Sequence, residues 1–221
     1  MFRDRVDAAQ QLADRLRQRS WTNPVVLAIP RGGVVIGAVL ARELNADLDV
    51  VLSRKLRAPT QPELAIGAIR EDGTIILNHH AQTVPHLTDE YIEREGQNQL
   101  AEIVRRKRVL RSVRPPVPVA GRSVIVTDDG IATGSTMIAA LQTVRSERPR
   151  EIVVAVPVAA PDRLEEIRRW CDDVVCLLAP DDFWAIGQFY EDFSPVEDDD
   201  VIALLRDAAQ ARGSRAGSRR G

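Results

Sequence analysis

Short apolar runs alternate with segments of helical periodicity along most of this chain. The apolar runs have the composition of buried strands and lie at 25–29, 48–53, 123–127, 151–159 and 173–178. Segments of helical periodicity precede the first run and follow three of the runs, at 3–19, 34–44, 135–147 and 161–170. Such alternation is typical of βαβ units. We therefore predict an α/β fold with an open, mainly parallel, five-stranded Rossmann-like sheet flanked by helices.

Between the second and third of these strands the pattern changes. Residues 54–63 read as a charged, proline-bearing loop, and 64–78 read as two short strands around a turn at Asp72. Residues 88–112 begin with a capping threonine and are expected to form a long charged helix that ends before Pro115. The sequence thus predicts a β-hairpin and a long helix inserted between two strands of the sheet.

Composition limits the setting in which such a domain works. The formal net charge is −2, which gives no reason to expect a nucleic-acid or membrane surface. Charges near the start exclude a signal peptide there, and the longest apolar runs are too short to span a bilayer. Cys171 and Cys176 do not form a CxxC pair, so we expect a reduced, cytoplasmic protein.

One stretch, "VIVTDDGIATGSTM" at 124–137, carries the chemistry. Asp128 and Asp129 end an apolar strand, and the small residues 130–136 lead into a helix N-terminus. Free backbone N–H groups and the helix dipole favour an anion there, while carboxylates accept hydrogen bonds from a pair of hydroxyls. A sugar with a terminal phosphate, such as ribose 5-phosphate, satisfies both ends of this loop.

Competing interpretations of the loop fit less well. A Walker A loop needs a lysine after its last glycine, whereas Ser135 follows Gly134, and no GxGxxG fingerprint is present. The plainest alternative is an acidic turn followed by a capped helix. The full string of fourteen residues argues against that alternative.

The string resembles the phosphoribosyl diphosphate (PRPP) binding motif of type I phosphoribosyltransferases, and the strand–helix order matches that family over about residues 20–180. The resemblance implies that Asp128 and Asp129 hold the ribose hydroxyls. It implies a 5-phosphate site at Ala132, Thr133, Gly134, Ser135 and Thr136. It also implies one phosphoribosyltransferase domain over 1–198. A C-terminal helix is expected at 199–210, and the low-complexity, basic stretch 211–221 is expected to be a disordered tail.

A pyrophosphate site follows from the same resemblance. "PRGG" at 30–33 stands where the family cradles pyrophosphate, so Arg31 would pair with a phosphate oxygen while Gly32 and Gly33 let the backbone approach. Arg54 and Lys55 resemble further pyrophosphate contacts. The alternatives are a simple strand-to-helix turn for "PRGG" and a solvated charged loop for the two basic residues.

The reaction implied by the family is displacement of pyrophosphate from C1 of the sugar by a nitrogen nucleophile. Mg²⁺ is the implied cofactor, with Asp128 or Asp129 contacting it directly or through water and with no dedicated metal cage. Residues 54–78 occupy the position of the flexible loop that closes over PRPP. The family also implies a homodimer, and neither nucleic acid nor membrane is expected as a partner.

The acceptor is expected to be a nucleobase or a similar small amine. Members of the family that use 6-oxopurines carry an aspartate at the position of Ala132. Adenine-type members have alanine there, as this chain does, and assign the proton-transfer role to a loop glutamate. Glu63 is the candidate for that role, and the alternative is that Glu63 is simply a solvated side chain. A hood at 180–198 is implied, to which the N-terminal helix or the helix at 86–112 could add. Its candidate base-binding residues are Phe183, Trp184 and Asp192. The alternative is a small aromatic core.

Three functions remain open at this point. The first is a phosphoribosyltransferase enzyme, and the second is a non-catalytic PRPP sensor of the same fold. The third is a phosphate-ester hydrolase or a salvage enzyme for another acceptor. His79 and His80 are expected to be loop residues rather than a metal pair, and the basic run 104–111 is expected to be one charged face of a helix.

Overall fold

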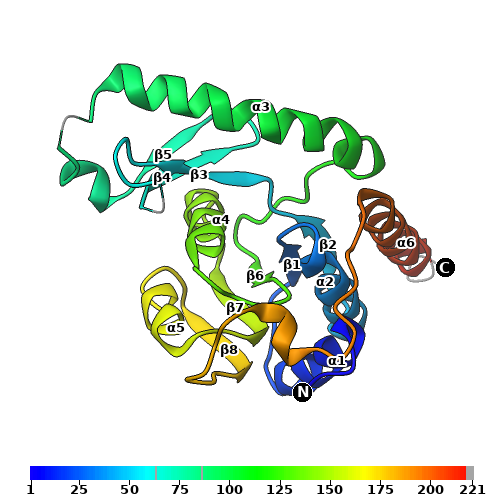
Figure 1. Cartoon of the computed structure of the whole chain (residues 1–221). Helices are drawn as coiled ribbons and strands as arrows, with labels where there is room; N and C mark the ends of the chain where they lie inside the picture. The colour runs from blue at the N-terminus through cyan, green and yellow to red at the C-terminus, as the bar shows by residue number, and fades with distance from the viewer. Residues whose placement is uncertain (63, 86, 218–221) are drawn as a thin grey trace.

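The fold was analysed in a computed structural model, which describes residues 1–62, 64–85 and 87–217, apart from the side chains of residues 79–80 and 212–217. The central sheet has five parallel strands in the order β2-β1-β6-β7-β8 (Figure 1). Their bounds are β1 Val25–Ala28, β2 Asp47–Val50, β6 Ser123–Thr127, β7 Glu151–Val158 and β8 Asp173–Leu178. The predicted five-stranded parallel sheet is therefore confirmed.

Helices cover both faces of this sheet because its strands are apolar on both sides. Along β1, Val26 and Ala28 face a core shared with the helices α1 (Arg5–Leu16) and α2 (Gly32–Glu43), whereas Val25 and Leu27 face a core shared with α4 and α5. This division follows from the two-residue period of a strand. The other two helices are α4 (Ser135–Ser146) and α5 (Pro161–Ile167).

A second, antiparallel sheet stands apart from the first, with the order β3-β4-β5. Its strands are β3 Ser53–Arg57, β4 Ala65–Arg70 and β5 Ile75–Leu77, and the predicted hairpin at 64–78 corresponds to β4 and β5. The expectation of a loop throughout 54–63 is wrong for its first residues, because β3 pairs with β4 and fully buries Leu56. The charged neighbours of Leu56 hid that strand from sequence patterning.

The predicted long helix is α3, Asp89–Val113, and the hydroxyl of Thr88 caps it by accepting a hydrogen bond from the backbone N–H of Tyr91. It lies along the small sheet, and α4 lies between the two sheets (Figure 1). His79 and His80 begin a short 3-10 helix, η1 (His79–Gln82). None of the helices in the described ranges is long and apolar enough to cross a membrane.

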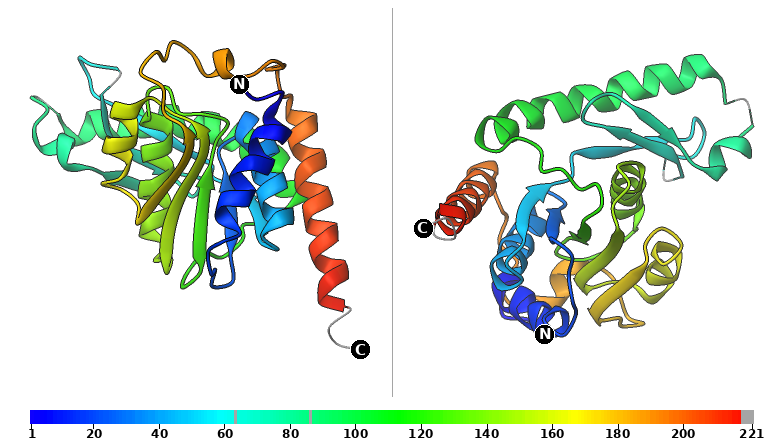
Figure 2. Two further views of the ribbon diagram at one scale, coloured as in Figure 1. Left: turned by 90° about the horizontal axis from the view of Figure 1, so that it is seen from below. Right: turned by 180° about the vertical axis from the view of Figure 1, so that it is seen from behind.

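The C-terminal segment returns across the start of the chain (Figure 2). Phe2 forms a parallel bridge with Tyr190, just after the 3-10 helix η2 (Ile186–Phe189). The last helix, α6, covers Asp198–Gly217 and so runs past the predicted end at residue 210. Ala211 and Ala216 lie in this extension, and alanine is the strongest helix former.

Candidate functional site

The loop after β6 lies at the carboxyl edge of the sheet and is buried at residues 129–131 but exposed at several positions further along. Asp128 and Asp129 follow Thr127, the last residue of that strand. Gly134 caps α4 with a φ of 77°, a left-handed conformation that a residue with a side chain adopts only with strain. Ala132, Thr133 and Thr136 are exposed, so packed side chains do not fill the space before the helix N-terminus. The first-turn backbone N–H groups of α4 therefore remain available to an anion.

The two aspartates are held differently. Asp129 is only 8% exposed, and its Oδ2 accepts a hydrogen bond of 2.8 Å from Nε of Arg5. The hydroxyl of Tyr190 donates to the backbone oxygen of Asp129 at 2.6 Å. Asp128 is half-buried and accepts from the backbone N–H of Asp129 through Oδ1 at 2.8 Å. Burial, and then the neighbouring Asp129 charge, raise the pKa of the Asp128 carboxyl well above its usual range.

The "PRGG" turn packs directly against this acid pair. Arg31 occupies the N-cap position of α2, and Gly32 and Gly33 begin the helix. A Cβ on Gly32 would lie 1.9 Å from Oδ2 of Asp129, and a Cβ on Gly33 would lie 2.9 Å from the Cα of Asp128. The absence of side chains at these two positions is therefore what allows the two loops to meet.

The strand β3 brings Arg54 and Lys55 to the same region. A cavity of about 280 Å³ is bordered by both residues, by Pro30 of the first loop and by Thr136 of the second. Nε of Arg54 donates to Oε1 of Gln99 on α3 at 3.2 Å. Groups from all three segments with predicted phosphate-binding roles thus border one cavity.

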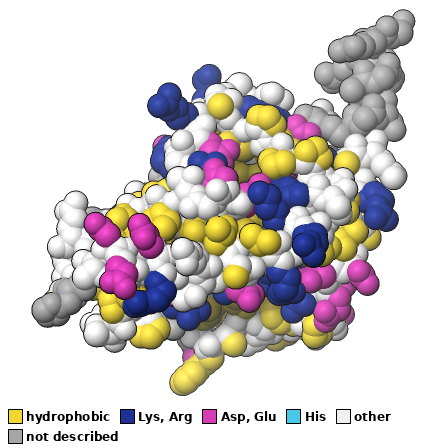
Figure 3. Space-filling model, turned by 90° about the horizontal axis from the view of Figure 1, so that it is seen from above, with side chains coloured by type: hydrophobic (Ala, Val, Ile, Leu, Met, Phe, Trp, Pro, Cys, Tyr) yellow, Lys and Arg dark blue, Asp and Glu magenta, His cyan; other side chains and the backbone are white. Residues whose placement is uncertain are grey.

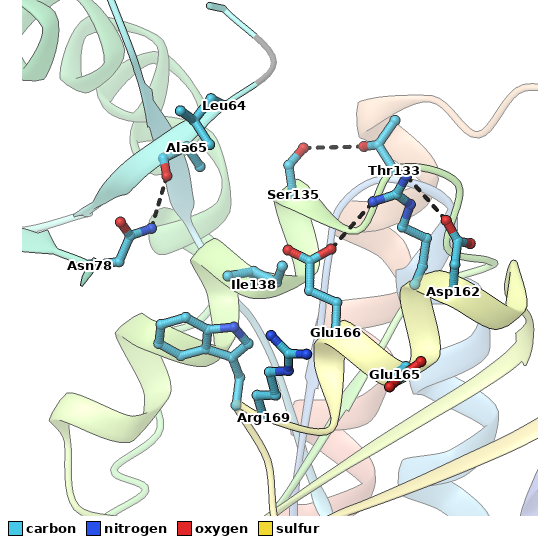
Figure 4. Close-up of a pocket in the computed structure, with 12 residues that line it drawn as sticks. Leu64, Ala65, Asn78, Thr133, Ser135, Ile138, Asp162, Glu165, Glu166 and Arg169 are labelled. Carbon is cyan, nitrogen blue, oxygen red and sulfur yellow. Dashed lines mark hydrogen bonds and ion pairs between the residues drawn. The ribbon is translucent and has the colours of Figure 1, made fainter. Parts of the chain in front are cut away.

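A larger cavity of about 690 Å³ lies on the other side of the α4 N-terminus (Figure 4). Thr133 and Ser135 border it, with their hydroxyls 3.2 Å apart, and Leu64 lies opposite them. Arg163, which also lines it, pairs with Asp162 at 3.2 Å and with Glu166 at 3.3 Å. The charges on this wall are therefore largely compensated within α5.

The predicted base-binding residues each contact a nearby residue of the hood segment. Phe183 packs against Phe189 with ring centroids 5.3 Å apart, and Trp184 is 85% exposed with its indole N–H donating to Asp182. Oδ1 of Asp192 accepts from the backbone N–H of Ser194 at 2.9 Å and from its hydroxyl at 2.5 Å. These two bonds lower the pKa of Asp192.

Other hood residues reach the acid pair instead, and sequence reasoning did not single them out. Tyr190 binds the Asp129 backbone, and Phe193 stacks on Tyr190 with centroids 5.1 Å apart. The guanidinium carbon of Arg5 lies 3.9 Å from the centre of the Phe193 ring. The aromatic run signalled a cluster here, but nothing in the sequence linked Arg5 to an aspartate 124 positions away.

Glu63, the candidate loop glutamate, lies outside the described residues. Within the described ranges, no group of three or more His, Cys, Asp or Glu side chains could hold a metal ion. Asp128 and Asp129 nevertheless fit Mg²⁺, because that ion takes one or two carboxylates together with waters and substrate phosphates.

Several known proteins resemble this chain over most of its length. The chain is 43% identical over 215 residues, 96% of its length, to the Mycobacterium tuberculosis proteins "Putative phosphoribosyl transferase MT0597" and "Putative phosphoribosyl transferase Rv0571c". It spans about half of each of these relatives, 48% of their length. The crystal structure of TT1426 from Thermus thermophilus matches with a TM-score of 0.90 and 45% identity, over 93% of this chain and 98% of that one.

A family match accounts for most of the sequence, including both aspartates and both glycine-containing loops. The phosphoribosyl transferase domain matches residues 3–194, from the segment that carries Arg5 to the end of the hood. The chain therefore belongs to the phosphoribosyl transferase domain family.

Proposed function

We propose that this chain binds PRPP and transfers its ribose 5-phosphate group to a nitrogen acceptor, with release of pyrophosphate. One observation carries the proposal: the "PRGG" turn and the acid pair are in direct contact, with Gly32 against Asp129. The amide cradle before α4 follows the acids within the same loop, so one small ligand could contact both. In this proposal, the acid pair receives the diol of the sugar, and the residues just after it in the chain receive the phosphate.

Each group has a definite task in this proposal. Asp128 and Asp129 accept hydrogen bonds from the ribose hydroxyls, and residues 132–136 donate backbone N–H groups to the 5-phosphate. Arg31, Arg54 and Lys55 neutralise the departing pyrophosphate. Mg²⁺, held by Asp128 or Asp129 directly or through water, would neutralise further charge on the leaving group. The chain's own part is to orient C1 toward the acceptor and to exclude water.

The remaining assignments belong to the same proposal. The hood receives a nucleobase-like acceptor, with Phe183 or Trp184 stacking on it and Asp192 accepting from an exocyclic amine; Glu63 serves as the loop carboxylate. Residues 54–78 close over PRPP as a lid. The protein acts as a homodimer in the cytoplasm, in keeping with two free cysteines, Cys171 and Cys176.

A PRPP sensor is the second candidate, and the ion pair between Arg5 and Asp129 favours it. A carboxylate already bound to a guanidinium suits a protein that exchanges one partner for another on ligand binding. The two candidates share PRPP binding and differ only in the transfer step.

Calorimetry with PRPP and Mg²⁺ tests the shared step. Asp129→Ala should abolish PRPP binding, whereas Asp162→Ala, which removes an exposed aspartate of α5, should leave it unchanged. Equal PRPP affinity in wild type and Asp129→Ala would refute the ribose assignment. Pyrophosphate release, screened over common nucleobases, then separates the candidates: release with any base supports the transferase, and binding without release supports the sensor.

Trp184→Ala tests the hood assignment separately. The substitution should weaken use of the accepted base and leave PRPP affinity unchanged, because the indole lies outside the PRPP loops. If the Michaelis constant for the base does not change, the stacking role of Trp184 is wrong.

A further inference from the structure

One face of α3 lines the smaller cavity. Gln99, Glu102, Ile103 and Arg106 border it, at spacings of three, four and seven residues from the first. These spacings place the four side chains on one side of a helix. Gln99 and Ile103 are buried at 6% and 2% exposure, so this face is fixed against the small sheet. The same packing of α3 on the small sheet positions Arg106 at the cavity.

The cavity has an excess of positive charge. The strand β3 contributes Arg54, Lys55 and Arg57, and Arg106 adds a fourth cation, while Glu102 is the acidic side chain on its wall. By contrast, the outer surface seen from the side of α3 intersperses basic and acidic side chains (Figure 3). The 104–111 run therefore divides into an outer face with charges of both signs and two inward-facing arginines, Arg106 at the cavity and Arg111 beside Asp49.

Arg106 has few of the compensations that its neighbours have. Arg111, further along α3, pairs with Asp49 at 2.6 Å and with Glu71 at 2.9 Å. Within the described ranges, no carboxylate forms an ion pair with half-buried Arg106. Burial, and then the positive charge of Arg54, lower its pKa; Asp198 opposes this with a smaller effect, and Arg105 and Arg31 add to the lowering. A partly desolvated cation repelled by other cations is stabilised when an anion enters the cavity.

We propose that Arg106 is a diphosphate-binding residue and that α3 forms one wall of the pyrophosphate site. A guanidinium presents a planar fork of N–H donors that binds phosphate oxygens in pairs, so Arg106 would act together with Arg54 of β3, which borders the same cavity. This inference deepens the proposed function, since it concerns the pyrophosphate half of PRPP. It assigns a binding role to a helix that lies outside the PRPP motif.

Binding of inorganic pyrophosphate with Mg²⁺, measured by calorimetry on the full chain, tests the proposal. Arg106→Gln should weaken binding roughly 10- to 100-fold, as expected for loss of charge-assisted hydrogen bonds. Arg105→Gln is the matched control, because Arg105 is 64% exposed on the same helix and contacts Glu102 at 3.8 Å. The pyrophosphate affinity of Arg105→Gln should stay within about twofold of wild type. Arg106→Lys should fall between wild type and Arg106→Gln, since it keeps the charge and loses the fork.

The outcomes separate this inference from the proposed function. If Arg106→Gln and Arg106→Lys melt as wild type does and bind pyrophosphate equally well, the inference is wrong, and Asp129-dependent PRPP binding would leave the proposed function standing. If Arg106→Gln does not fold, Arg106→Lys decides by the same criterion. If wild type binds pyrophosphate through Arg106 and does not bind PRPP, the inference holds while the proposed function fails. If wild type binds no pyrophosphate, the inference also fails.

Discussion

Arg5 and Asp129 form an ion pair that joins the N-terminal helix to the acid pair. Nε of Arg5 lies 2.8 Å from Oδ2 of Asp129, and each side chain is 11% exposed. Nη1 of Arg5 also donates to the backbone oxygen of Ser194 at 2.9 Å, and the guanidinium lies over the Phe193 ring. One arginine thereby connects α1, the hood and the loop after β6.

Replacing this arginine should destabilise the protein. Arg5→Gln leaves a buried carboxylate without its cationic partner, and the expected loss in free energy of unfolding is about 3 kcal/mol. Arg3→Gln is the control, because Arg3 is 76% exposed and pairs with Asp7 at 3.4 Å. Its expected effect is below about 1 kcal/mol. Denaturant unfolding of the two variants checks this, and equal losses would contradict the structural role of Arg5.

The raised pKa of Asp128 predicts opposite pH trends for stability and ligand binding. The folded protein holds this proton more tightly than the unfolded chain, so the associated stability is present at low pH and is lost as pH rises through the raised pKa. The ionised carboxylate should bind PRPP more tightly than the neutral acid, so PRPP affinity should weaken as pH falls through the same pKa. Thermal unfolding and calorimetry across pH measure the two trends.

Asp128→Asn is the control for both trends. The phosphates of PRPP titrate at about pH 6 and therefore add their own pH dependence to PRPP binding. That contribution is retained when Asp128 is replaced. Any additional pH dependence of the wild-type protein, relative to Asp128→Asn, is due to the Asp128 carboxyl. Superimposable profiles for wild type and Asp128→Asn would remove the carboxyl from the explanation.

Much of the fold could be predicted from the sequence because it depends on local periodicity. The apolar run "VVLA" located the buried strand β1, and the run from Asp128 to Gly134 located the strand-to-helix loop. The strand β3 escaped detection because Arg54, Lys55 and Arg57 surround its one buried apolar residue, Leu56. Hydrophobic patterning detects buried strands, and this strand is mostly polar.

The parts of the site that sequence reasoning missed depend on long-range packing. The periodicity of α1 marks its apolar face but does not indicate that Arg5 contacts Asp129. Similarly, the charged run on α3 does not show which of its arginines borders the cavity. The inward-facing side of α3 could have been identified from Ile103, a buried residue three positions before Arg106, once the helix was known to lie on a sheet. Only the tertiary structure supplies that sheet.

Gly32→Ala should disturb the acid pair through crowding. Its Cβ would lie 1.9 Å from Oδ2 of Asp129 and 3.0 Å from Nε of Arg5, so the carboxylate must move out of its ion pair. Overpacking of this kind costs roughly 1–3 kcal/mol, and PRPP affinity should fall as well. Gly37 lies on the same helix, and its added Cβ would lie 2.9 Å from the Cβ of Ala28 on β1. Gly37→Ala should therefore lower stability without a specific effect on PRPP affinity. If the two variants lose PRPP affinity equally under conditions where both are folded, the effect of Gly32 is not specific to the acid pair.

Glu197 pairs with Arg31 and, in the proposed function, competes with pyrophosphate for it. Oε2 of Glu197 lies 3.1 Å from Nη1 of Arg31, and the two side chains are 67% and 43% exposed. Exposed pairs contribute up to about 1 kcal/mol, so Glu197→Gln should tighten binding of inorganic pyrophosphate by at most about fivefold. Calorimetry at low salt measures the gain, which should shrink at high salt as the pair is screened. Glu191→Gln, at another exposed position of the same segment, should leave the affinity unchanged. Weaker pyrophosphate binding by Glu197→Gln would show that Glu197 supports Arg31 rather than occupying it.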